Sequence, residues 1–171
     1  MKKTVFLWAI ILSMIFESCG NVASNYKGYR VQLSSRDEVY AEFDMSIFRG
    51  IASAGMTYKE MVEIAGEPDE YDDSESSIEE TLYNPVYYGQ GGKLVVAWGG
   101  DNVNERIGLL KFIPFDNEPF YLSEFVHNPE TLGITSEMDD FAVYVDDILY
   151  FIVHLKNGRI TKISYWLVRE K

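Results

Sequence analysis

The sequence has very few of the residues that build disulfides and metal centres. Its 171 residues include one Cys and two His. A single Cys excludes an internal disulfide. His127 and His154 lack the further Cys or His ligands that a zinc site requires. We therefore expect no metal and no cofactor, and the importance of Cys19 must lie in its position.

Positive charge is also scarce. The chain carries 15 Lys and Arg against 27 Asp and Glu, which gives a formal net charge of -12. Phosphate backbones attract basic proteins, so this balance argues against nucleic acid as a partner. The composition is 47% hydrophobic and 25% charged, which is typical of a globular protein rather than a disordered one.

Recognisable catalytic motifs are missing as well. The chain contains no Gly-x-Ser-x-Gly and no Gly-rich dinucleotide turn. The Gly-rich stretch 87–93 leads into a predicted strand, so no helix N-terminus is available there to hold phosphate. We therefore predict that the protein is not an enzyme.

An acidic run extends from residue 67 to residue 80. It lacks the ligand spacing and the turn-forming Gly of a calcium loop. Like charges at this density repel each other, which favours a solvated loop. A binding site for a basic partner, or a pair of carboxylates for hydrolysis, are the alternatives.

The N-terminus has the pattern of a signal peptide. Lys2 and Lys3 precede an apolar run from Val5 to Phe16. That run is shorter than the roughly 20 residues that span a bilayer, but it suits the apolar region of a signal peptide. Small residues surround Cys19 directly afterwards. The sequence predicts a signal peptide over 1–18.

The segment around Cys19 resembles the lipobox of bacterial lipoproteins. It departs from the usual pattern at Phe16 and Glu17, where Leu and a small residue are common. The resemblance implies cleavage before Cys19, a lipid on its sulfur and anchoring to the outer membrane. An ordinary secreted protein and an uncleaved membrane anchor are the alternatives. Residues 19–35 are polar, and we expect them to form the lipidated tether of a domain over 36–171.

Hydrophobic spacing predicts the elements of that domain. Apolar residues three and four apart indicate a helix over 37–55, and a short helix is possible over 135–145. Strands are expected over 91–100 and 106–115. The clearest hairpin covers 147–168, where Asn157-Gly158 is a favoured two-residue turn.

A second short helix, over 58–65, has strong start and stop signals. Thr57 and Glu60 have the spacing of a capping box. Met56 and Met61 are placed to form a hydrophobic staple. Gly66 suits a left-handed C-terminal cap, and Pro68 prevents continuation. We expect Met61 and Ile64 to face a sheet, with Tyr58, Lys59 and Glu63 nearer to solvent.

This stretch resembles the SmpA/OmlA family of small outer-membrane lipoproteins of the β-barrel assembly machinery. The matching residues are Gly55, Met56, Thr57, Met61, Ile64, Gly66 and Pro68. The resemblance implies a β-lactamase-inhibitor-like α+β fold, with short helices packed on an antiparallel sheet. It also implies a role in envelope assembly, although fold alone does not determine function.

A possible internal repeat would divide the domain. Gly133-Ile134-Thr135 echoes Gly55-Met56-Thr57, and a hairpin follows each. Two tandem αββ units would then cover 50–115 and 130–171. The alternative is chance similarity, in which case the chain forms one α+β domain with a four-stranded sheet.

The hairpin over 147–168 is apolar on both faces, whereas a strand with one solvated face should alternate. Counting outward from the turn pairs Leu155 with Ile160, Val153 with Lys162 and Phe151 with Ser164. It also places Phe151, Val153 and Trp166 on one face, a candidate surface for a protein partner. The alternative is that other segments cover both faces.

Together these patterns predict an envelope lipoprotein, facing the periplasm or the cell surface, that binds a protein partner. Its expected role is a scaffold or accessory factor in outer-membrane assembly. The alternative is an inhibitor or immunity protein that blocks a secreted enzyme or toxin, and a small hydrolase is a third hypothesis.

Overall fold

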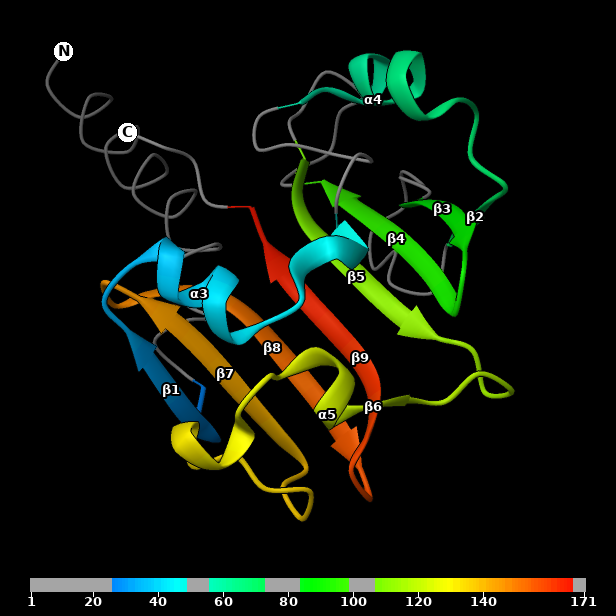
Figure 1. Cartoon of the computed structure of the whole chain (residues 1–171). Coiled ribbons are helices and arrows are strands. Elements are labelled where there is room, and N and C mark those ends of the chain that lie inside the picture. Colours follow the sequence, from blue (N-terminus) through cyan, green and yellow to red (C-terminus); the bar gives the residue numbers. More distant parts are fainter. Residues whose placement is uncertain (1–25, 49–55, 73–83, 99–106, 168–171) are drawn as a thin grey trace, which may run out of the picture.

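The computed structural model describes residues 26–48, 56–72, 84–98 and 107–167 (Figure 1). Within these ranges, nine strands form one mixed sheet with few, short helices. The fold is therefore dominated by its sheet rather than being a balanced α+β structure. The strands are β1 (Tyr29–Leu33), β2 (Glu70–Asp72), β3 (Asn84–Gly89), β4 (Gly92–Trp98), β5 (Ile107–Pro114), β6 (Phe120–Tyr121), β7 (Asp140–Val145), β8 (Ile148–Lys156) and β9 (Arg159–Trp166).

The strand order is β1-β7-β8-β9-β5-β4-β3-β2, and β6 also pairs with β9. All pairs are antiparallel except β1 with β7, which is parallel. β9 lies in the middle of the sheet, between β8 and β5. The chain thus forms one continuous sheet, not the four-stranded sheet of the alternative prediction.

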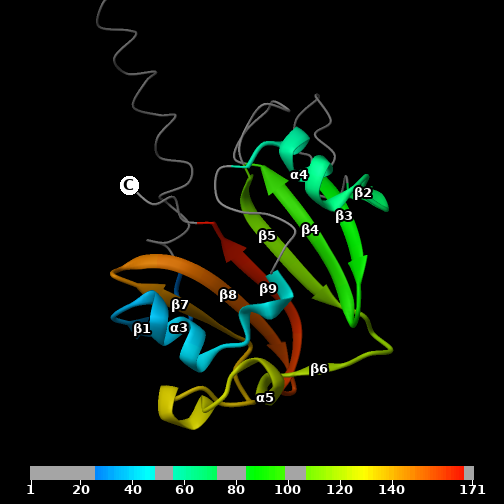
Figure 2. The ribbon, with the colours of Figure 1, turned by 45° about the horizontal axis from the view of Figure 1, so that its top comes forward.

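The helices lie on one face of this sheet (Figures 1 and 2). Within the described ranges they are α3 (Arg36–Glu42), the 3-10 helix η1 (Met45–Phe48), α4 (Tyr58–Ala65), α5 (Leu122–Phe125) and the 3-10 helix η2 (Pro129–Leu132). Four fully buried aromatic rings fill the space between α3, α5 and the strands: Phe43, Phe125, Phe141 and Phe151. The ring centroids of Phe43 and Phe151 are 4.9 Å apart in an edge-on arrangement, which aromatic pairs favour.

The hairpin of β8 and β9 confirms the predicted turn. Asn157 and Gly158 have φ angles of 54° and 73°, and a two-residue type I′ turn requires positive φ at both positions. Asp146 and Asp147 connect β7 to β8 in the same way, with φ angles of 50° and 62°. Aspartate tolerates this conformation better than most residues.

The helix predicted over 37–55 is wrong in its extent. Ser35 caps α3 by accepting a hydrogen bond from the backbone N–H of Glu38. α3 then ends at Glu42, because Phe43 is extended and forms a β-bridge with Val126. This bend places the ring of Phe43 in the core, and η1 follows separately. Residues 49–55 lie outside the described ranges.

The helix predicted over 135–145 is also wrong, because residues 140–145 form strand β7. Five of its six residues are buried, from Phe141 to Val145. Burial on both faces removes the alternation that normally reveals a strand. The 3-10 helix η2 and a turn precede β7, so the predicted αββ unit over 130–171 does not begin with an α-helix. This finding removes the second αββ unit.

Two further strands lie where loops were expected. β1 occupies part of the predicted tether 19–35, and its Val31 and Leu33 are buried in the core. The tether therefore ends before Tyr29. β2 occupies the start of the acidic run, where Glu70 pairs with Val86 of β3. Residues 73–83, which complete that run, lie outside the described ranges.

Candidate functional site

The short helix α4 has the ends that its sequence predicts. Thr57 is the N-cap, and its Oγ accepts a hydrogen bond from the N–H of Glu60 at 3.3 Å. The Glu60 carboxylate in turn accepts from the N–H of Thr57 at 2.8 Å. This confirms the capping box. Met56 and Met61 both join the main core cluster, as a staple requires. Gly55 lies outside the described residues.

The C-terminal end of α4 differs from the prediction. Gly66 has φ 84° and ψ -175°, so its φ is positive but it is not in the left-handed helical region. This extended conformation with positive φ is almost restricted to glycine. The hydroxyl of Tyr87 on β3 donates to the Gly66 carbonyl at 3.0 Å, and Pro68 follows. The helix end is thus fixed to the sheet.

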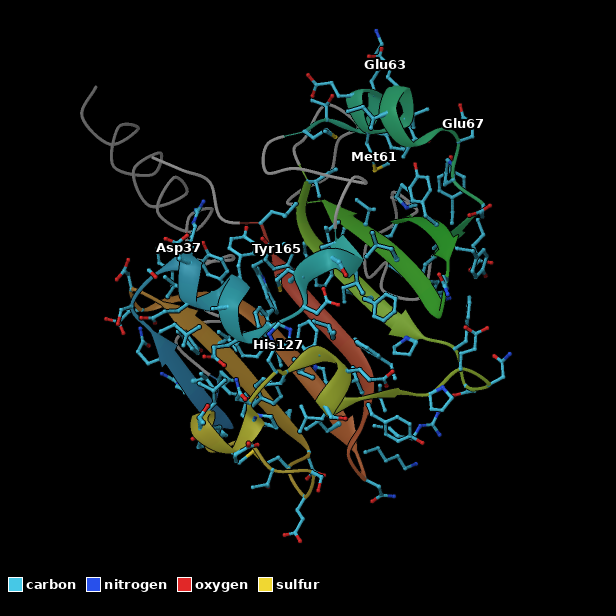
Figure 3. The ribbon with its side chains drawn as sticks, viewed as in Figure 1. Asp37, Met61, Glu63, Glu67, His127 and Tyr165 are labelled. Atoms are coloured by element: carbon cyan, nitrogen blue, oxygen red, sulfur yellow. The ribbon has the colours of Figure 1, made fainter. Side chains whose placement is uncertain are left out.

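The orientation of α4 was predicted only in part. Met61 is fully buried and points toward the sheet, whereas Glu63 points away (Figure 3). Ile64 is 63% exposed, so the prediction that it faces the sheet is wrong. Tyr58 is half-buried rather than solvent-facing, and its hydroxyl lies 2.8 Å from that of Tyr71 on β2. The motif around α4 therefore attaches the helix to β2 and β3, which is a structural role.

The predicted partner surface does not form. Phe151 and Val153 are fully buried in the main core, beneath the helices. Trp166 packs against a separate small cluster on the other face. Trp166 is separated from them by a register shift in β9 near Thr161: Leu155 pairs with Ile160 as predicted, but Val153 pairs with Ile163 and Phe151 with Tyr165. A one-residue shift moves every following side chain to the opposite face.

The face of the sheet opposite the helices collects positive charge. Nine Lys and Arg residues fall within the described ranges: Lys27, Arg30, Arg36, Lys59, Lys93, Lys111, Lys156, Arg159 and Lys162. The strand registers place six of them on this face: Arg30, Lys93, Lys111, Lys156, Arg159 and Lys162. We call this surface the basic face. It stands out because the whole chain has a net charge of -12.

Two acidic side chains of the basic face are already engaged. The Glu70 carboxylate pairs with Lys93, with 3.4 Å between the charged atoms. Asp140 accepts a hydrogen bond from the hydroxyl of Tyr26. Within the described ranges, Lys156, Arg159 and Lys162 form no ion pair. The positive charges of these three residues, at one end of the basic face, are therefore not neutralised by an ion pair within the described ranges.

A pocket of about 390 Å³ lies beside two of these cations, Lys156 and Arg159. It forms where β5 and β9 diverge: their pairing extends from Leu109–Trp166 only to Phe112–Ile163. The N–H of Phe115 then donates to the Gly91 carbonyl at 3.0 Å, which turns the chain toward β4. The chain returns to β9 through β6, where Phe120 pairs with Ile160. The pocket fills the gap left between the two strands.

The pocket has an apolar wall and a polar rim. The wall is formed by Ile113, Pro114, Phe115 and Ile160. The rim is formed by Asp116, Lys156, Asn157, Arg159 and Thr161. The guanidinium of Arg159 donates to the backbone carbonyl of Asp116 at 3.2 Å, which restrains the long side chain at the rim. Sequence reasoning missed this site, although the spacing of Lys156, Arg159 and Lys162 in an acidic chain was a visible signal.

Two titratable groups of the basic face have shifted pKa values. Burial lowers the pKa of His154, and the neighbouring charge of Lys162 lowers it further, while Asp140 opposes both. Burial raises the pKa of Tyr26, and its hydrogen bond to Asp140 adds to this shift. His154 is therefore held neutral and Tyr26 protonated near pH 7.

Within residues 26–48, 56–72, 84–98 and 107–167, no group of three or more His, Cys, Asp or Glu side chains is arranged to hold a metal ion. None of the helices in those ranges has the length and apolar character needed to cross a membrane. Cys19 lies outside the described residues. Comparison of the chain with protein-family models, with curated proteins and with solved structures finds no match.

Proposed function

We propose that the protein is an envelope lipoprotein, held at the outer membrane by a lipid on Cys19, that binds a protein partner and serves as a scaffold or accessory factor in envelope assembly. The placement of Cys19 at the end of a signal-like segment supports the anchor. The resemblance of the α4 segment to the SmpA/OmlA family supports the assembly role. β1 begins ten residues after Cys19, so the anchor and the sheet are close in the chain.

The observation that carries the binding function is the gathering of positive charge on the basic face. Six of the nine described cations lie on this one side of the sheet, although the chain as a whole is acidic. Complementary potentials steer partners together and exclude wrong ones. The partner surface is accordingly acidic. The Trp166 indole, half-buried at the same face, supplies the kind of aromatic group that interfaces favour.

Site-specific crosslinking tests the binding function. A photoreactive residue placed at Lys162 should capture a partner in intact cells, whereas one at Lys59 should not. Lys59 is a matched control, because it is equally charged, well exposed and located on α4. Capture of an outer-membrane β-barrel protein, or of a component that assembles it, would support the proposal. Capture of a soluble secreted enzyme or toxin at Lys162 would instead favour an inhibitor or immunity protein.

The contribution of charge is tested separately. Lys111→Glu together with Lys162→Glu should weaken the captured complex strongly, and raising the salt concentration should weaken the wild-type complex as well. Lys59→Glu should leave the complex unchanged. A complex that tolerates both reversals and high salt would place the interface elsewhere.

Metabolic labelling with a fatty-acid analogue tests the anchor independently. The wild-type protein should carry the label and partition with membranes. Cys19→Ala should carry none. An unlabelled wild-type protein that stays soluble in the periplasm would refute the anchor, even if the crosslinking result supported a partner.

A further inference from the structure

We infer that the pocket between β5 and β9 binds a small monoanionic ligand that carries a carboxylate next to an apolar group. This site goes beyond the proposed protein-binding function, since it takes a ligand of its own. The pocket volume of about 390 Å³ lies within the range of small-molecule sites, about 300–1,000 Å³. Such sites combine an apolar lining with a few polar groups that fix the ligand.

The charges of the rim select an anion. Lys156 and Arg159 contribute two positive charges, and Asp116 contributes one negative charge, so the lining has one net positive charge. Neither cation forms an ion pair within the described part of the chain. A singly charged carboxylate balances this lining, whereas a doubly charged phosphate would leave it negative. The Arg guanidinium also matches the planar geometry of a carboxylate.

The position of Arg159 is prepared before a ligand arrives. One of its donors is bound to the Asp116 carbonyl at 3.2 Å, and a guanidinium has five N–H donors in all. The remaining donors are therefore free for a ligand while the side chain is already restrained. Restraint of this kind lowers the entropic cost of binding.

The wall selects the rest of the ligand. Ile113, Pro114, Phe115 and Ile160 offer hydrocarbon surface, and the ring of Phe115 is stacked on Tyr88 with 6.0 Å between centroids. This support holds the ring in place as part of the wall. A phenyl-sized group beside the carboxylate suits such a surface. The carboxylate can belong to a free organic acid or to the C-terminal residue of a peptide.

Calorimetric titration of the full chain in a non-ionic detergent tests the site with defined probes. 3-Phenylpropionate represents a free acid and N-acetyl-phenylalanine represents a peptide C-terminus. N-acetyl-phenylalaninamide has the same shape without the charge. At least one of the two carboxylates should bind, and the tighter one identifies the source of the ligand. The neutral amide should bind about tenfold more weakly or not at all, since hydrogen bonds to charged groups are the stronger ones.

Variants locate the binding. Arg159→Gln should weaken carboxylate binding about tenfold or more, and Lys162→Gln, a cation of the same face outside the pocket lining, should not. If Arg159→Gln does not fold, Lys156→Gln replaces it, because the exposed Lys156 side chain contributes no packing. Equal binding of acid and amide would overturn the inference. So would unchanged binding by the rim variants, or binding of phenyl phosphate or inorganic phosphate alone.

Discussion

The hydroxyl of Tyr87 and the carbonyl oxygen of Gly66 are 3.0 Å apart, and this hydrogen bond joins strand β3 to the end of helix α4. The last carbonyls of a helix lack partners within the helix. Tyr87 supplies one from the sheet, and burial raises its pKa, so it remains a donor at neutral pH. An eight-residue helix is marginal on its own, and such contacts decide whether it stays in place.

Tyr87→Phe should lower the free energy of unfolding by about 1 kcal/mol, because it removes this bond and keeps the ring. Urea unfolding followed by circular dichroism measures the change. Tyr40→Phe is the matched control: Tyr40 is 59% exposed, and its substitution should leave stability unchanged. Equal stability of both variants would show that the bond contributes nothing.

Thr57→Ala should destabilise the protein by about 1 kcal/mol, because it removes the N-cap of α4. Glu60→Gln should cost less than Glu60→Ala, since glutamine can also close a capping box. Lys59→Ala, at a neighbouring exposed position, provides the control in the same unfolding assay. The capping argument fails if Thr57→Ala is no worse than this control.

Gly66→Ala should cost roughly 1–3 kcal/mol through backbone strain alone. A Cβ at Gly66 would meet no atom within 4 Å, so crowding plays no part. Asparagine should be no better than alanine, because its advantage is limited to the left-handed helical region, which Gly66 does not occupy. Gly89→Ala is the control: its φ is not positive, and its Cβ would meet only a carbonyl oxygen at 3.9 Å. Thermal unfolding of Gly66→Ala, Gly66→Asn and Gly89→Ala measures these differences in stability.

Met61→Ala should cost about 2–5 kcal/mol, because Met61 is fully buried between α4 and the sheet. Ile64→Ala should change stability by less than about 0.5 kcal/mol, because Ile64 is 63% exposed. The two residues share one helix and lose comparable volumes, so each serves as the control of the other. Chemical denaturation that ranks them in the reverse order would mean that α4 is rotated.

The lowered pKa of His154 predicts a specific dependence of stability on pH. The folded protein binds the proton less well than the unfolded chain, whose His titrates near 6.5. Stability is therefore retained above about pH 6.5 and declines as the pH falls below this value, until the folded protein is also protonated. Wild type should lose unfolding free energy relative to His154→Gln as the pH falls over that range. An NMR titration should show a higher pKa for His154 in Lys162→Gln, because this variant removes the neighbouring positive charge that lowers it.

Features set by neighbouring residues could be predicted from the sequence, and features set by distant pairing could not. The capping box of Thr57 and Glu60 and the turn at Asn157-Gly158 depend on residues within a few positions of each other. β1 is different: Tyr29 pairs with Phe141, and nothing near Tyr29 in the sequence indicates this partner. The polar character of residues 19–35 therefore predicts only a tether.

The pocket and the partner surface illustrate the same limit. A shift of one residue near Thr161 puts Trp166 on the face opposite Phe151 and Val153, and no local signal marks that irregularity. The pocket exists because β5 leaves β9 after Phe112 while β6 returns to Ile160. Three separate segments create it, so only the folded chain reveals which cations line it.

The central position of β9 also determines how the sheet can be completed. β8 and β5 flank it, although β5 precedes it by more than forty residues. Before β9 docks, the sheet consists of two separate halves, each ending in an apolar strand with an unpaired backbone edge. Such edges readily pair with other chains. A chain that crosses a membrane from its N-terminus would expose both edges until β9, its last strand, emerged, so chaperones that protect strand edges would matter most in that interval.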